Sequence, residues 1–230
     1  MILKISHTTR YSYADPGTQL VQKLRLTPQD NGSQTILDWK IEAPGIDKAA
    51  VHTDGLGNVV HLLAQSDPPA ETSITASGRV ETRDTGGVCG ADKTRINPQI
   101  FLRSTPLTES SAGIDALAEK ARRIAGGDDV LAHLHTLMGL IAEAVAYETN
   151  TTHSGTSAIE AFEAGQGVCQ DHAHILIAAA RYHEIPARYV TGYLHVEGGV
   201  QAVAHHAWAE AHVADLGWVG FDPANGICPS

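Results

Sequence analysis

Alternating apolar and polar residues dominate the first third of the chain. A period of two residues is typical of half-buried β-strands, because successive side chains point to opposite faces of a sheet. Clusters of Asp, Asn, Gly and Pro separate the alternating runs at the spacing of a sandwich or a small open barrel. The pattern predicts an antiparallel β module over residues 1–84, with strands at Ile2–Tyr13, Leu20–Leu26, Thr35–Ile41, Asn58–Ala64 and Thr72–Val80.

The second half of the chain has a different pattern. Residues 85–107 contain Gly and Pro without sustained periodicity, so we expect a surface connection there. Beyond it the apolar residues follow a helical period, with helices expected at Ile114–Ala125, at Val130–Val145, after Ser157 and from Cys169 onward. Strand patterns then return at Arg188–Val196, Ala207–Val213 and Trp218–Asp222. Helices followed by a sheet predict an α+β domain over residues 108–230.

Composition and charge narrow the class of protein. Of the 230 residues 43% are hydrophobic before glycine is counted, which excludes a disordered chain. The formal net charge of −10 argues against a general binder of nucleic acid or anionic membranes, which would need a basic face. The sequence contains no run of 18 apolar residues and no recognisable secretory leader, so we expect a cytoplasmic protein. Three cysteines without a C-x-x-C pair favour free thiols over disulfides or a thiolate zinc site.

One cysteine occupies a position that favours chemistry. Cys169 follows the glycine-rich segment Gly165-Gln-Gly-Val and lies in the first turn of the helix that we expect to be most buried. Unpaired N–H groups and the positive end of the helix dipole lower the pKa of a thiol there, and the same N–H groups can bind an oxyanion. Most free cysteines are small buried hydrophobic residues, so this position alone is weak evidence for a nucleophile.

A histidine and an aspartate follow at a spacing that a β-hairpin can bring together. A turn near Ala214 would set His206 opposite Asp222, with the two Cβ atoms about 5 Å apart. The turn residues Asp215-Leu-Gly217 come slightly later, so a bulge or an offset loop is required. With Cys169 docked above, the three side chains would form a nucleophile, a base and a carboxylate that orients the imidazole. Taken singly, the histidine is typical of a half-buried strand and the aspartate of a turn.

The motifs around these residues resemble the bacterial transglutaminase-like proteins, whose core has the papain-like cysteine-protease fold. In the second half the resemblance rests on Gly167-Val-Cys-Gln-Asp-His-Ala-His174, Ile185-Pro-Ala-Arg-Tyr-Val-Thr-Gly-Tyr193, His206-Ala-Trp-Ala-Glu210 and Gly217-Trp-Val-Gly-Phe-Asp-Pro223. In the β module it rests on Ile5-Ser-His-Thr-Thr-Arg-Tyr-Ser-Tyr13, Leu24-Arg-Leu-Thr-Pro28 and Asp54-Gly-Leu-Gly-Asn58. The resemblance implies that Cys169 is the nucleophile, His206 the general base and acid, and Asp222 the orienting residue, with no cofactor and no metal.

The implied chemistry is acyl transfer through a Cys thioester, on a protein, peptide or small amide substrate. Water as the acceptor would make the protein a protease or amidase and an amine would make it a transglutaminase; we favour hydrolysis slightly. Members of the family continue well past the Asp-Pro motif, whereas this chain ends eight residues after Asp222. A C-terminally truncated core or a fragment is therefore a further expectation.

Two other classes of function stay open on the sequence. One is a metal site, because histidines crowd the region of the candidate triad: His172, His174, His183, His195, His205, His206 and His212. The first two point about 200° apart on a helix, so they cannot share a metal as an i, i+4 pair would. The other class is a binding or scaffold protein that retains a triad-like core. Cys89 and Cys228 are expected to be accessible thiols, so preferential alkylation of Cys169 at low pH would favour the enzyme.

Overall fold

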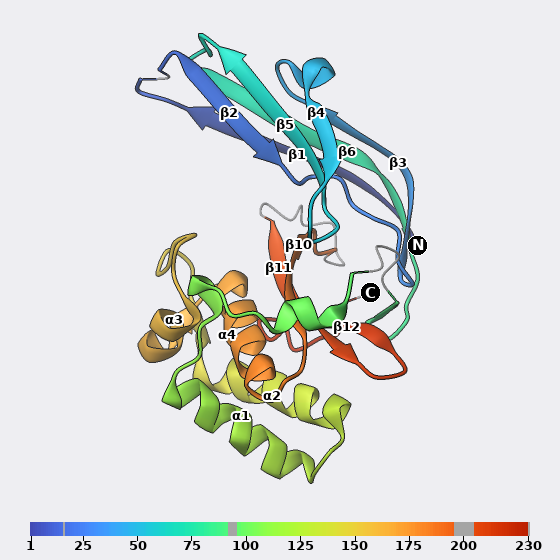
Figure 1. Ribbon diagram of the computed structural model, residues 1–230, viewed down its shortest axis with the longest axis vertical. Helices are drawn as coiled ribbons and strands as arrows, with labels where there is room; N and C mark the ends of the chain where they lie inside the picture. The colour runs from blue at the N-terminus through green and yellow to red at the C-terminus, as the bar shows by residue number, and fades with distance from the viewer. Residues whose placement is uncertain (16, 92–95, 196–204, 230) are drawn as a thin grey trace. The chain divides into compact units, whose positions relative to one another are not determined.

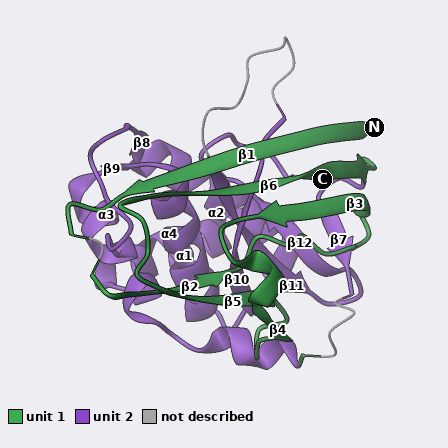
Figure 2. Ribbon diagram, turned by 90° about the horizontal axis from the view of Figure 1, so that it is seen from above, with its two compact units in different colours: residues 1–84, 93–96 green, residues 85–92, 97–230 purple. Residues whose placement is uncertain are grey.

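The computed structural model describes residues 1–15, 17–91, 96–195 and 205–229. The chain divides into two units (Figure 2), an N-terminal unit of residues 1–84 and 93–96 and a C-terminal unit of residues 85–92 and 97–230. None of the helices in the described part of the chain combines the length and the apolar character that a membrane span needs.

The N-terminal unit contains two three-stranded antiparallel sheets (Figure 1), one in the order β1-β6-β3 and the other in the order β2-β5-β4. A small apolar cluster, built on Leu24, Leu63 and Ile74, joins strands of the two sheets. The antiparallel module expected from the alternation is confirmed. The structure adds strand β4, which was not predicted because its four residues are too few to show a clear alternation. The elements are β1 (Ile2–Ser12), β2 (Gln19–Leu24), β3 (Gln34–Glu42), η1 (Ile46–Lys48), β4 (Ala50–Thr53), β5 (Val59–Ser66) and β6 (Glu71–Thr82).

The C-terminal unit combines helices with a four-stranded antiparallel sheet in the order β10-β11-β12-β7. Helix α4 is central to it, because α4 contacts the other three helices as well as β10 and β11 (Figure 1). The helices are α1 (Ala112–Ala125), α2 (Val130–Ala144), α3 (Ala158–Ala164) and α4 (Cys169–Tyr182), with 3₁₀ turns η2 (Pro98–Leu102) and η3 (Pro106–Thr108). The strands are β7 (Val88–Gly90), β8 (Ala146–Tyr147), β9 (Gln166–Gly167), β10 (Ala187–Gly192), β11 (His206–Val213) and β12 (Gly217–Phe221).

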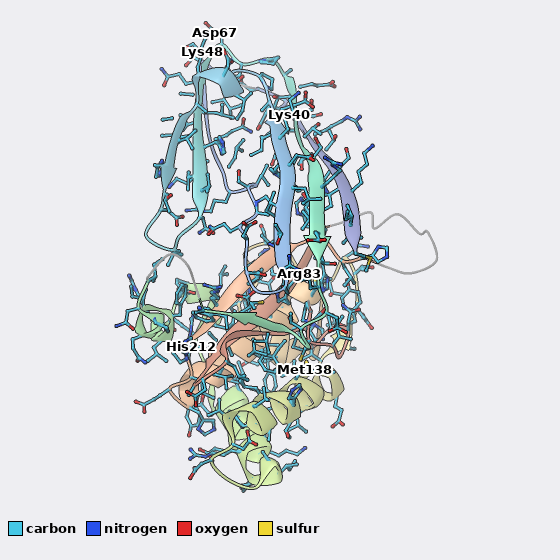
Figure 3. All side chains as sticks on the ribbon, turned by 90° about the vertical axis from the view of Figure 1, so that its right-hand side faces the viewer. Lys40, Lys48, Asp67, Arg83, Met138 and His212 are labelled. Atoms are coloured by element: carbon cyan, nitrogen blue, oxygen red, sulfur yellow. The ribbon has the colours of Figure 1, made fainter. Side chains whose placement is uncertain are left out.

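Local sequence signals explain where the helices begin and end. Gly126 adopts φ +82° after α1, and the Asp129 carboxylate accepts the N–H of Ala132 at 3.0 Å to cap α2. Ser157 and Glu160 form the expected capping box at the start of α3. Ten successive residues of α4, 171–180, are buried, as its apolar stripe predicts. The apolar residues among them belong to one large cluster, which also includes Met138 of α2, labelled in Figure 3.

The segment expected to be a surface connection, residues 85–107, is partly built into the C-terminal unit. β7 pairs with β12, and Phe101 in η2 is buried with its ring edge-on to Trp218 at a centroid distance of 5.1 Å. The expectation of a simple connection is therefore wrong for this stretch. Strand β7 has only three residues and shows no periodic pattern, so it can be recognised only from its pairing with β12, which is distant in the sequence. Val196, the last residue of the strand expected from Arg188, lies outside the described residues.

Candidate active site

The first turn of α4 is held in place by a buried carboxylate. Asp171 is fully buried, and its Oδ2 accepts the N–H of Val168 at 2.8 Å and the hydroxyl of Thr152 at 2.7 Å. A side chain at Gly167 would put its Cβ 2.8 Å from the Cβ of Asp171, so the close approach requires glycine. These contacts explain why the glycine-rich segment places Cys169 at the first position of the helix.

The Cys169 thiol is half-buried and surrounded by hydrogen-bond donors. Burial alone would raise its pKa, but a hydrogen bond with His206 and the backbone N–H groups of Ala207 and Gln170 outweigh burial. The pKa of the thiol is therefore lowered from its ordinary value of 9.0. A thiol of this kind ionises more readily than a free cysteine, and the thiolate is the nucleophilic form.

His206 links the thiol to Asp222. Its Nε2 donates to Oδ2 of Asp222 over 2.6 Å, and both side chains are largely or fully buried. The hydrogen bond with Asp222, followed by the one with Cys169, raises the pKa of His206 from 6.5 to about 9. Because Nε2 is engaged by the carboxylate, Nδ1 is the ring nitrogen left for Cys169. The structure thus brings all three candidate residues into one hydrogen-bonded group.

The β11–β12 hairpin reaches this arrangement by a different register from the expected one. Val213 pairs with Gly217, so the turn is centred on residue 215 rather than 214. Continuing this register places Asp222 opposite residue 208, two positions from His206 and on the same face of the strand, so the two side chains meet diagonally. Asp215 at φ +66° and Gly217 at φ +78° form the offset loop that the sequence required. The expected proximity is correct, whereas the expected direct pairing is wrong.

A tight turn after β12 holds Asp222 and adds a residue that the sequence analysis did not single out. Oδ1 of Asp222 accepts the N–H groups of Ala224 at 3.1 Å and Asn225 at 3.3 Å. The side-chain amide of Asn225 donates to Oδ2 of Asp222 at 2.7 Å. The signal that could have found Asn225 is the pattern Asp-Pro-x-Asn-Gly, which is typical of an Asx-type turn in which residue four lies over residue one.

Aromatic side chains surround the candidate triad. The ring of Trp208 stacks on His206 at a centroid distance of 6.2 Å, as expected for residues two apart on one strand. Burial, then the charges of Cys169 and Asp222, raise the pKa of Tyr147 on β8. Burial, then the charge of Cys169, raises the pKa of Tyr189 on β10 to about 12. Both tyrosines therefore lie within electrostatic reach of the thiol.

The histidines near the triad are placed in separate environments. The ring of His172 lies between the carbonyl oxygens of Val168 at 2.9 Å and Val145 at 3.0 Å. His174 packs on Tyr189 at a centroid distance of 5.2 Å. Three others have their own ring neighbours: His183 lies beside His133, His205 beside Tyr193 and His212 beside Trp218. Within the described ranges no three His, Cys, Asp or Glu side chains come close enough together to hold a metal ion.

The two other thiols differ from expectation. Cys89 is only 7% exposed and its Sγ lies 3.4 Å from Oε1 of Glu210, so it is not an accessible thiol. Cys228 is half-buried, and burial raises the pKa of its thiol. The expectation failed for Cys89 because residues 88–90 form a strand of the sheet rather than a loop.

Two protein-family models match this chain. Residues 118–223 match the transglutaminase-like superfamily, and residues 3–81 match the bacterial transglutaminase-like N-terminal region. This chain is a transglutaminase-like protein. The second match falls on the sheets of the N-terminal unit, and the first includes Cys169, His206 and Asp222.

Curated relatives extend over nearly the whole transglutaminase-like chain. "Uncharacterized protein ML0607" of Mycobacterium leprae is 28% identical over 98% of this chain and 84% of its own length. "Uncharacterized protein Rv2569c" of Mycobacterium tuberculosis is 25% identical over 96% of this chain and 78% of its own length.

A solved structure supports the same fold. The protein described as "a Putative Cysteine Protease from Cytophaga hutchinsonii" superposes with a TM-score of 0.70 at 21% identity, covering 99% of this chain and 80% of that one. The α+β architecture of the C-terminal unit is therefore the papain-like, transglutaminase-like cysteine-protease fold.

Proposed function

We propose that this transglutaminase-like protein cleaves or transfers amides through a Cys169 thioester, with His206 as base and acid and Asp222 as the orienting residue. One observation carries the proposal: a thiol of lowered pKa at a helix N-terminus is hydrogen-bonded to a histidine that a buried carboxylate holds at 2.6 Å. A thiol that contacts an imidazole, which in turn contacts a carboxylate, is the arrangement of nucleophile, base and orienting group that activates a cysteine.

The first half of the reaction forms the thioester. The Cys169 thiolate forms a C–S bond at the amide carbonyl, and the carbonyl oxygen becomes an oxyanion. The N–H of Cys169 has no acceptor within its own helix, so it can donate to that oxygen. The C–N bond then breaks as His206 gives its proton to the departing amine. A pKa of about 9 keeps the imidazole protonated at neutral pH, ready for this step.

The second half releases the acyl group. A water molecule or a primary amine attacks the thioester while His206 takes its proton, and the C–S bond breaks to return the thiolate. Water yields a carboxylic acid and an amine yields a new amide. We favour water, with a protein, peptide or small amide as substrate.

Mass spectrometry of the intact protein tests the proposal. The protein is incubated with a peptide library, alone and with a library of primary amines, then quenched with acid and mapped by peptide digestion. We expect an acyl adduct on Cys169, and release of a free carboxylic acid when water is the acceptor. Cys228 serves as the internal control thiol. Adducts on both thiols in equal yield, or none on Cys169, would instead favour a binding or scaffold protein.

A further inference from the structure

Asn225 makes contacts that neither the candidate triad nor the sheet requires. Its Nδ2 lies 2.7 Å from Oδ2 of Asp222 and 3.2 Å from Nε2 of His206. Nε2 already donates to the same Oδ2 at 2.6 Å, so two N–H donors converge on one carboxylate oxygen. The opposite orientation of the amide would set oxygen against oxygen, so the hydrogen-bond network itself assigns Nδ2 to this position.

The local backbone holds Asn225 where it can act. Oδ1 of Asp222 accepts the backbone N–H groups of residues 224 and 225, and the N–H of Asp222 donates to the carbonyl of Ile227 at 2.9 Å. Gly226, at φ +66°, turns the chain back to make that last contact. One carboxylate oxygen therefore holds the turn, and the other receives the two side chains.

We propose that Asn225 is a positioning residue that acts on His206 through Asp222, an inference that rests on the proposed function. Asp222 is fully buried whereas Asn225 is exposed, so the amide covers the side of the carboxylate nearest to solvent. By occupying a second acceptor site of Oδ2, the amide fixes the orientation of the carboxylate toward the imidazole. Without it, water gains access to Oδ2, competes with the imidazole and screens the pair.

The titratable groups around His206 come from four elements. Cys169 at the start of α4 and Asp222 after β12 hydrogen-bond with it, while Tyr147 on β8 and Tyr189 on β10 lie within electrostatic reach of the thiol. Burial, the largest cause in each case, raises the pKa of both phenols, so they stay neutral through pH 9. The pH response of the pair between pH 4 and pH 9.5 therefore reports the thiol, the imidazole and the carboxylate.

The pH dependence of Cys169 alkylation tests this role. The rate of iodoacetamide modification of Cys169 is measured by peptide mapping in the wild type, in Asn225→Ala and in a control, Asn97→Ala. Asn97 also makes a local side-chain hydrogen bond in the same unit: its Oδ1 accepts the N–H of Gln99 at 3.0 Å and caps η2. The wild-type profile has a lower inflection where the thiolate–imidazolium pair forms and an upper one, near pH 9, where His206 loses its proton.

We expect Asn225→Ala to move the upper inflection down and the lower one up, each by about one pH unit, because a hydrogen bond to a charged group has been lost. A second variant, Asn225→Asp, keeps the shape but adds a negative charge beside Nε2, so its upper inflection should move up. Asn97→Ala should retain the wild-type profile. Lost folding alone would give each variant the single inflection of an ordinary, accessible thiol, so it would not move the upper inflection in opposite directions in the two variants.

An upper inflection that does not fall in folded Asn225→Ala overturns the positioning role. Should that variant fail to fold, an unchanged upper inflection in Asn225→Asp overturns it as well. A wild-type Cys169 that labels no faster than Cys228 at pH 5.5 contradicts the proposed function itself, and the positioning role falls with it. If the wild-type profile has two inflections and Asn225→Ala leaves both unchanged, the proposed function stands and only the positioning role of Asn225 is overturned.

Discussion

The two units of this protein bury their apolar residues in different ways. In the N-terminal unit, the cluster that joins the sheets has three buried members, Leu24, Leu63 and Ile74. In the C-terminal unit one cluster extends from α1 through α4 to β12, and ten successive residues of α4 are buried. Alternating strands bury one face, whereas a central helix buries almost its whole circumference. The rigid element is thus the one that carries Cys169.

Charged pairs show the same contrast. Arg79 and Asp38 of the N-terminal unit form an ion pair of 2.6 Å with both side chains more than half exposed. In the C-terminal unit Arg188 pairs with Glu210 at 2.8 Å, the glutamate is almost fully buried, and the guanidinium lies 4.0 Å from the centroid of the Trp218 ring. Water screens the first pair more strongly than the largely buried second pair, so similar distances represent unequal energies.

The largest expected effect concerns the chemistry of the C-terminal unit. Cys169→Ala and His206→Ala should each lower turnover of an amide substrate by at least about a thousandfold, because the members of a triad act as a unit. Asp222→Asn should retain more activity, since the carboxylate forms no bond to substrate. Turnover is measured on the peptides identified by adduct formation, with Cys228→Ala as the matched thiol control. Full activity in a folded Cys169→Ala protein would refute the triad.

The next largest effect concerns the buried ion pair. Arg188→Ala leaves the Glu210 carboxylate buried without its guanidinium, which should lower the free energy of unfolding by about 3 to 5 kcal/mol. Arg79→Ala, the exposed counterpart, should cost about 1 kcal/mol or less. Urea unfolding of both variants measures the difference. Equal losses would mean that burial does not distinguish the two pairs.

Two glycines with the same backbone angle sharpen the comparison. Gly45 in the N-terminal unit and Gly217 at the β11–β12 turn both have φ +78°. An added Cβ meets nothing within 4 Å at Gly45 but lies 2.5 Å from the backbone of Gly90 at Gly217. We expect Gly45→Ala to lower the free energy of unfolding by about 1 kcal/mol and Gly217→Ala by about 2 to 4 kcal/mol. Thermal unfolding of the pair checks the order, and a reversed order would contradict the β7–β12 contact.

The smallest effect is a dependence of stability on pH in the C-terminal unit. The pKa of His206 is raised from 6.5 to about 9, chiefly by Asp222, so the folded state holds a proton that the unfolded chain releases. This contribution is complete below pH 6.5 and is lost as pH rises through 9, on the order of 1 to 3 kcal/mol. Hydrogen exchange should show the loss in α4 and β11. Protection that increases over this interval would contradict the assigned contact.

Much of the fold could be predicted because its signals are local. Alternation marks the strands, the Ser157 capping box and Gly126 mark helix ends, and the glycine-rich segment before Cys169 marks the start of α4. Each of these depends on residues within one turn or one strand of each other, and their propensities act before any tertiary contact forms. The family motifs added the candidate roles of Cys169, His206 and Asp222.

Contacts between distant segments were decided by the tertiary structure. β7 becomes a strand only because β12 offers it hydrogen-bonding groups, and Cys89 is buried for the same reason. The diagonal meeting of His206 and Asp222 follows from a turn centred one residue later than the midpoint, which sequence spacing could not distinguish. Asn225 lies over Asp222 because a five-residue turn closes on a carboxylate that the sheet has already placed. The sequence by itself thus determined the chemical groups and the local elements that carry them. The tertiary structure decided which of these groups contact one another, because strand register and burial depend on partners that are far apart in the chain.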